Sequence, residues 1–161
     1  MASVNTLFKS VLNVKNTVIK NCNLYSDKNG VKHIRIQARP NKWHENDCPF
    51  CHKSCPVYDK HSSRPTIWRG LDWGGILVEV EYQTHRLICP EHGVYVAEVP
   101  WAYPCSRFTK DFDLTAAWFA SYLPRSTTSY FMRVDWETVG RCVNRVLHNL
   151  EPERSRTVSY T

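Results

Sequence analysis

Two short motifs rich in cysteine and histidine are the parts of this sequence best suited to metal chemistry. The motif CPFC supplies Cys48 and Cys51, and the motif CPEH supplies Cys89 and His92. Two ligands separated by two residues can point from one tight turn toward one ion, and two such turns complete a tetrahedral set. Thiolate and imidazole ligands favour zinc over magnesium or calcium. We therefore predict one structural zinc ion on these four side chains.

Neighbouring residues leave the exact ligand set open. Cys55 is the favoured substitute for a named ligand, and His52 and His44 are also close in sequence. A catalytic zinc of the deaminase kind would require an H-x-E motif, which the sequence lacks. The remaining cysteines stand apart and are interpreted as small apolar residues: Cys22, Cys105 and Cys142.

The elements that must position these ligands are predicted to be strands. Ile76, Val78 and Val80 share one face and Glu79 and Glu81 the other, which indicates a strand expected to continue to residue 88 and deliver Cys89. A short return strand is expected over residues 94–97. Residues 45–100 are thus predicted to form a small β-rich zinc-binding domain with a knuckle and a hairpin.

The first 44 residues are predicted to form a basic arm with one strand, over residues 31–36. Residues 1–45 carry eight Lys and Arg against two acidic residues, out of a net charge of +6 for the whole chain. Such an arm suits a polyanionic partner. A merely solubilising tail remains an equal alternative.

Residues 107–152 change to helical spacing. Phe112, Ala116 and Phe119 share one helix face, Pro124 ends that helix, and a short second helix is expected through Met132. Asp135 is the predicted N-cap of a third helix. This predicts a helix-turn-helix domain after a linker over residues 101–106, with a tail over residues 153–161. The fold class is therefore α+β: a β-rich zinc-binding domain, then three helices.

The polar side chains of these helices are candidates for contact with DNA. Those expected to set register on phosphates are Ser126, Thr127, Thr128 and Arg133. Those expected on the outer face of the third helix are Glu137, Thr138, Arg141, Asn144 and Arg145. Trp136 is expected to pack inward. A three-helix packing unit with a solvated polar face is the open alternative.

The motifs taken in order resemble those of insertion-sequence transposases of the ISL-three type. The matching segments span roughly residues 45–150 and read CPFC, LDWGG, CPEHG, VPWAYPCSRFT and VDWETVGR. The resemblance implies a zinc finger and a helix-turn-helix that recognise terminal inverted repeats, followed in the family by a DDE nuclease. We expect that nuclease, and hence enzymatic activity, to be absent from these 161 residues.

The expected function is sequence-specific binding of duplex DNA at transposon ends. One alternative is a stand-alone regulator or truncated inhibitor of transposition, and another is a zinc-stabilised protein-interaction module. No apolar run reaches about 18 residues and no signal peptide is recognisable, so we expect a cytoplasmic protein. The resemblance implies that it is bacterial and associated with the nucleoid. Neither a membrane nor a small-molecule substrate is expected, and homodimerisation is left open.

Overall fold

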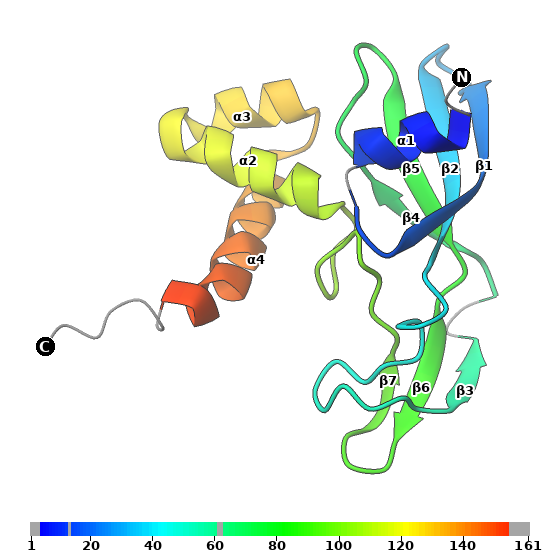
Figure 1. Cartoon of the computed structure of the whole chain (residues 1–161). Helices are drawn as coiled ribbons and strands as arrows, with labels where there is room; N and C mark the ends of the chain where they lie inside the picture. Colours follow the sequence, from blue (N-terminus) through cyan, green and yellow to red (C-terminus); the bar gives the residue numbers. More distant parts are fainter. Residues whose placement is uncertain (1–3, 13, 61–62, 155–161) are drawn as a thin grey trace, which may run out of the picture. The chain divides into compact units, whose positions relative to one another are not determined.

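The computed structural model describes residues 4–12, 14–60 and 63–154, which fall into two compact units (Figure 1). The first unit extends to Thr109 and the second begins at Lys110. Within the described residues, the first unit holds one helix and seven strands and the second holds three helices. The predicted α+β class is confirmed. Among these described helices, none is both long and apolar enough to cross a membrane.

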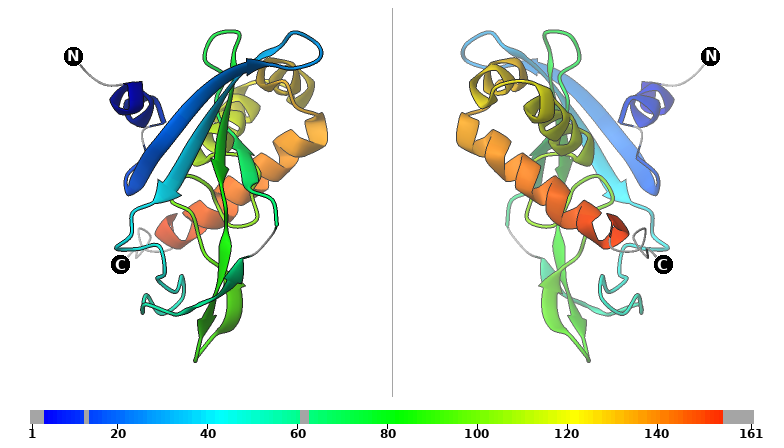
Figure 2. Two further views of the ribbon diagram at one scale, coloured as in Figure 1. Left: turned by 90° about the vertical axis from the view of Figure 1, so that its right-hand side faces the viewer. Right: turned by 90° about the vertical axis from the view of Figure 1, so that its left-hand side faces the viewer.

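A four-stranded sheet forms the larger part of the first unit. Its strands, in spatial order, are β1 (Thr17–Ser26), β2 (Lys32–Pro40), β5 (Leu77–Tyr82) and β4 (Thr66–Arg69). The pairing of β2 with β5 is parallel, and the other two pairings are antiparallel. Alternate residues of the two central strands are buried, among them Ile36 and Val80. Helix α1 (Val4–Leu12) adds Phe8 to this core and lies beside the sheet (Figure 2).

The predicted basic arm is wrong, because residues 4–12 and 14–40 are folded into the first unit. They form α1, β1 and β2 rather than an arm with one strand. The turn over residues 27–30 joins β1 to β2. The Asp27 carboxylate accepts hydrogen bonds from the N–H groups of Asn29 and Val31, both at 2.8 Å, and Gly30 supplies a φ of 77°. The lysines of this region are therefore spread over folded elements, with Lys9 on α1, Lys20 on β1 and Lys32 on β2.

A three-stranded antiparallel sheet forms the rest of the first unit. Its spatial order is β3 (Val57–Lys60), β6 (His85–Cys89) and β7 (Gly93–Val96). The predicted return strand is present as β7, but the single strand predicted to continue to residue 88 is two strands in two different sheets. The change of sheet falls at residues 83–84, where the Thr84 hydroxyl lies 3.4 Å from that of Thr66.

The predicted linker over residues 101–106 is also wrong. Trp101 is fully buried and makes edge-to-face contacts with Trp68 and Tyr82, at ring-centroid distances of 5.6 and 5.7 Å. Ala102 is buried with it. These residues belong to the core of the first unit, so the division between units falls at Thr109 instead.

The second unit consists of α2 (Lys110–Tyr122), α3 (Arg125–Met132) and α4 (Trp136–Arg154). Buried side chains come from all three helices: Phe112, Ala116, Met132, Val139, Cys142 and Val146. Periodicity in the sequence predicts an apolar face of the third helix made of Val139, Val143, Val146, Leu147 and Leu150, and this is only partly right, because Leu147 and Leu150 are exposed and Cys142 is buried. The predicted tail begins inside α4, and residues 155–161 lie outside the described residues.

Candidate metal centre and the exposed face of the last helix

The four predicted ligands lie together in the first unit. The ligand atoms of Cys48, Cys51, Cys89 and His92 all lie within 4.8 Å of one another. Cys89 ends β6 and His92 lies in the turn to β7, where Gly93 adopts a φ of 77°. The other two ligands belong to a knuckle that precedes β3. Within it the Cys48 N–H donates to the Lys53 carbonyl at 2.9 Å.

The distances within this cluster fit a tetrahedral zinc ion. With zinc–sulfur bonds of about 2.3 Å and zinc–nitrogen bonds of about 2.0 Å, a tetrahedron places two sulfurs about 3.8 Å apart and a sulfur and nitrogen about 3.5 Å apart. The Sγ atoms of Cys51 and Cys89 are 3.8 Å apart. The Nδ1 atom of His92 lies 3.4 Å from the Cys89 Sγ and 3.6 Å from the Cys48 Sγ. These residues could therefore hold a metal ion.

The substitute ligands considered from the sequence are outside this cluster. Cys55 is buried, but its thiol donates to the Lys53 carbonyl at 3.5 Å. The His44 Nδ1 atom lies 2.8 Å from an Asp47 carboxylate oxygen. His52 is exposed and occupies a tight turn at a φ of 57°. The first choice of four ligands is thus the set that the fold brings together.

Local electrostatics favour thiolates at two of the ligands. Burial opposes ionisation of Cys48, but the nearby Tyr95 hydroxyl and two backbone N–H groups of the knuckle outweigh it and lower the pKa of this thiol to about 6. Burial likewise opposes ionisation of Cys89, yet His92 holds its pKa below the ordinary value. The thiolate is the form that binds metal, so the lowered pKa values of Cys48 and Cys89 favour metal binding.

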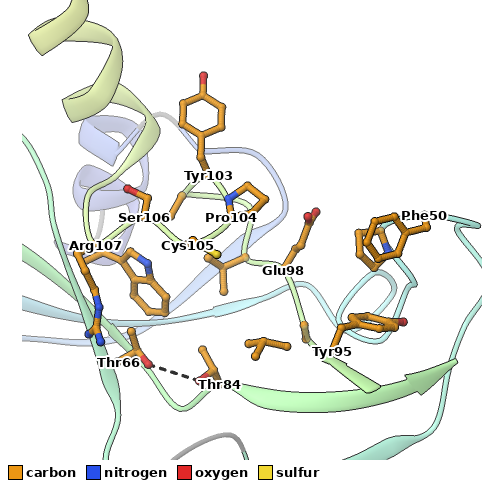
Figure 3. A pocket seen from close by; sticks show the side chains of 16 residues that line it. Phe50, Thr66, Thr84, Tyr95, Glu98, Tyr103, Pro104, Cys105, Ser106 and Arg107 are labelled. Carbon is orange, nitrogen blue, oxygen red and sulfur yellow. Dashed lines mark hydrogen bonds between the residues drawn. The ribbon is translucent and has the colours of Figure 1, made fainter. Parts of the chain in front are cut away.

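Two aromatic residues that the sequence did not single out surround the cluster. The Phe50 ring lies 5.1 Å from the His92 ring and 6.1 Å from the Tyr95 ring. Both aromatic residues also border a cavity of about 510 Å³, whose other wall is the segment from Tyr103 to Arg107 (Figure 3). Phe50 lies between two ligands of the CPFC motif, a position that could have suggested a role beside the metal.

Three of the nine predicted DNA contacts are engaged within the second unit. Thr128 is fully buried. Thr138 is buried, and both its N–H and its hydroxyl donate to the Asp135 carboxylate, at 2.7 and 2.8 Å. Arg145 forms an ion pair of 2.7 Å with the fully buried Asp113. These three side chains stabilise the helices and are not free to reach DNA, which corrects their assignment.

The other six candidates are accessible. Ser126, Arg133, Glu137, Arg141 and Asn144 are exposed, and Thr127 is half-buried. Glu137 and Arg141 form a surface ion pair of 3.1 Å on consecutive turns of α4. Trp136, which we expected to pack inward, is 57% exposed at the start of the helix. The outer face of α4 therefore exposes both Arg141 and Asn144.

Comparison with known proteins relates the sequence of this chain to transposases. No protein-family model matches the chain, and no solved structure matches it. Two curated relatives from Mycobacterium tuberculosis, strains CDC 1551 and H37Rv, each carry the name "Transposase for insertion sequence element IS1557". Each is 34% identical over 152 residues, which is 93% of this chain and 34% of the relative.

The class to which these findings point is the insertion-sequence transposase. The similarity supports homology to such a transposase, as the sequence motifs suggested. The chain spans about a third of the length of the curated relatives it matches. One protein that the chain resembles is the IS1557 transposase of Mycobacterium tuberculosis.

Proposed function

We propose that this chain is the DNA-recognition part of an insertion-sequence transposase of the ISL-three type, and that it binds duplex DNA at terminal inverted repeats. The observation that carries the proposal is the similarity to the IS1557 transposase, because it extends over 93% of the chain and so takes in both units. A protein with this role works in the bacterial cytoplasm, on the nucleoid.

The arrangement of α3 and α4 supports a helix-turn-helix reading. Only three residues, 133–135, separate the two helices. Arg133 adopts the left-handed conformation, with a φ of 53°, and its N–H bonds back to α3. Asp135 then caps α4 through Thr138. A turn of three to four residues is typical of this motif, whose second helix enters the major groove.

In this proposal α4 is the recognition helix. Arg141 suits bidentate pairing with guanine, and Asn144, three residues later, suits adenine. Glu137 holds the Arg141 guanidinium in place before binding, at 3.1 Å. Ser126, Thr127 and Arg133 contact phosphates and set the register of the helix on the duplex.

The metal of the first unit is, in this proposal, one structural zinc ion. Four protein ligands close the tetrahedron, so no position remains for substrate or an activated water. Two acidic residues of the second unit are also engaged in structure, since Asp113 pairs with Arg145 and Asp135 caps α4. We therefore propose that this chain binds DNA without cutting it. Magnesium-dependent strand cleavage by the purified chain would contradict this.

The test of the recognition helix is the variant Arg141→Ala, measured on the preferred duplex and on duplexes with single base changes. Loss of one bidentate base contact costs about 1–3 kcal/mol on the preferred duplex and relaxes preference at one base pair. The control is Lys28→Ala, which removes the same charge from the turn between β1 and β2. It should keep the base preference. Equal loss by Arg141→Ala on every duplex would reject α4 as the reader.

A salt titration separates DNA binding from protein interaction. Neutralisation of phosphates makes the logarithm of affinity fall with the logarithm of salt by about 0.9 per phosphate. We expect such a slope for the whole chain on its preferred duplex. An affinity for DNA that is weak and without base preference would favour the protein-interaction module instead.

A further inference from the structure

The first unit contains a cavity of about 510 Å³ that the proposed contacts of α3 and α4 do not use. Its walls come from the knuckle and from the segment over residues 103–107 (Figure 3). Among the residues that line it, Trp68 and Thr84 are buried, whereas Phe50 and Arg107 are exposed. The cavity is therefore open to solvent. Its volume is within the range of about 300–1,000 Å³ that sites for small ligands occupy.

Aromatic rings supply much of the apolar wall. Four residues of this kind line the cavity: Phe50, Trp68, Tyr95 and Tyr103. The Phe50 side chain is 66% exposed, yet its ring is held by contacts with the rings of His92 at 5.1 Å and Tyr95 at 6.1 Å. An accessible ring that is fixed in this way can stack on a flat heterocycle. Unpaired nucleic-acid bases stack favourably on such rings, because every base has an aromatic face.

Two side chains of opposite charge line the cavity and have no ionic partner among the residues that the structure describes. They are the exposed Glu98 and Arg107, and in Figure 3 the Arg107 side chain lies at the opposite end of the cavity from Phe50. The Thr66 and Thr84 hydroxyls lie 3.4 Å apart in the wall and can bond the edge of a base as well as each other.

This combination favours a nucleotide over a side chain of a partner protein. An exocyclic amino group of a base donates to a carboxylate such as Glu98, and a phosphate accepts from an arginine such as Arg107. An apolar side chain of a protein would fill the same space but would use neither charge. The homology to transposases makes DNA the source of the nucleotide.

We propose that the cavity binds one unpaired base of a DNA strand, with a preference for cytosine. Phe50 stacks on the base, Glu98 accepts a hydrogen bond from its amino group, and Arg107 contacts the adjoining phosphate. A base reaches such a cavity from a single strand, or from a duplex after it leaves the stack. The inference rests on the proposed function, because it takes DNA as the partner, but it uses no residue of α4.

The test is a titration of the full zinc-loaded chain with short single strands of deoxycytidylate or of thymidylate, followed by NMR of the backbone amides. A single strand presents unpaired bases and no duplex for α4 to read. We expect the shifts to gather at residues that line the cavity, such as Thr84 and Ala97. The cytosine strand should bind about tenfold more tightly, because thymine lacks the amino group and one hydrogen bond to a charged acceptor has about that effect.

A bulky side chain in the cavity should block the site. Val96 lines the cavity from β7 and is 38% exposed, so Val96→Trp should fill the space and abolish binding of both strands. The matched control is Val94→Trp, on the same face of β7 and 44% exposed, since Val94 does not line the cavity. It should bind like the wild type.

The two charged residues should fail in different ways. Glu98→Gln should remove the preference for cytosine, and because Glu98 is exposed this variant keeps the test decisive if Val96→Trp loses zinc. Arg107→Ala should reduce the salt dependence of single-strand affinity by about 0.7, the loss of one phosphate contact. Lys28→Ala, in the turn between β1 and β2, should leave both properties unchanged.

Four results would overturn the proposal: no shift with either strand, equal affinity for both strands, undiminished binding by Val96→Trp, or tighter binding of free deoxycytidine monophosphate than of the strand. The first would leave the cavity to a protein side chain, and the last would make it a site for free nucleotides. A chain that selects a duplex motif but leaves the cavity unshifted keeps the recognition proposal and rejects this one. Binding of unpaired cytosine in the cavity without any duplex preference would do the reverse.

Discussion

The two sheets of the first unit are held together by different means. The four-stranded sheet has a core of large apolar side chains, including Ile36, Val80, Trp68 and Trp101. The buried cluster of the three-stranded sheet consists of Cys48, Cys55, Leu87, Cys89 and Ala97, of which three are cysteines. One region can fold on apolar burial, whereas in our proposal the other is held together by an ion on Cys48, Cys51, Cys89 and His92.

The two sheets should therefore respond differently to loss of the metal and to loss of an apolar core side chain. Apolar burial contributes roughly 25 cal/mol per Å², so a core that contains two tryptophans is stable without a ligand. The buried cluster of the three-stranded sheet contains a single leucine, so apolar burial stabilises it much less. Metal binding in small zinc domains provides the folding free energy that an apolar core would otherwise supply.

The largest expected effect is therefore loss of the metal. The variant Cys48→Ser should lose zinc and disorder β3, β6 and β7, because about 10–16 kcal/mol of apparent binding free energy disappears. The amide spectrum of the four-stranded sheet should persist. Native mass spectrometry and two-dimensional NMR measure both outcomes.

A matched control asks whether the ligand set is complete. Cys55→Ser replaces a buried thiol that is outside the four-residue cluster, so this variant should retain one zinc ion per chain. A zinc-free Cys55→Ser, or a zinc-loaded Cys48→Ser, would mean that the ligands are wrongly assigned.

The second largest effect is expected on the stability of the four-stranded sheet. Trp101→Ala leaves a cavity between Trp68 and Tyr82 and should destabilise the four-stranded sheet by about 3–5 kcal/mol. Zinc content should not change. Trp43→Ala, at an exposed position, should alter stability by no more than about 0.5 kcal/mol. Denaturant unfolding followed by NMR separates the two sheets, and loss of zinc in Trp101→Ala would show that they are not independent.

The smallest effect concerns the outer face of the four-stranded sheet. Burial opposes ionisation of Glu79, but Arg35 and Tyr25 donate to its carboxylate, each at 2.8 Å, and hold its pKa below the ordinary 4.5. This stabilisation is therefore present above pH 4.5 and is lost as the pH falls through the lowered pKa.

The variant Glu79→Gln tests this sign. Its unfolding midpoint should depend less on pH below 4.5 than that of the wild type. Loss of zinc in acid affects both proteins alike, so the difference between them isolates the carboxylate. Glu98→Gln, at an exposed position, serves as the control and should follow the wild type. Identical pH profiles for Glu79→Gln and the wild type would show that the ionised Glu79 carboxylate does not stabilise the fold.

Local patterns in the sequence were enough to predict the four side chains that lie together as a possible metal site. Cys48 and Cys51 are brought together by one tight turn, and Cys89 and His92 by another, so spacing alone carries the information. The alternation of Val78 and Val80 likewise predicted a buried strand face. Only the meeting of the two turns depends on the fold.

The errors came from features that depend on tertiary contacts. Strand β1 is an edge strand with mostly polar exposed residues, so its sequence gives no clear alternation. A linker was predicted over residues 101–106, yet Trp101 within it is buried by partners more than 15 residues earlier in sequence. The helical wheel placed Arg145 outside, but its partner Asp113 lies on another helix.

The central claim is that the chain reads a DNA sequence, and selection of duplexes from a random pool tests it most directly. The zinc-loaded chain would be used at about physiological salt, with Arg141→Ala selected in parallel. We predict enrichment of one motif of roughly 10 base pairs, about one helical turn, with one position relaxed in the variant. No enriched motif, or the same motif at equal strength with Arg141→Ala, would contradict the account.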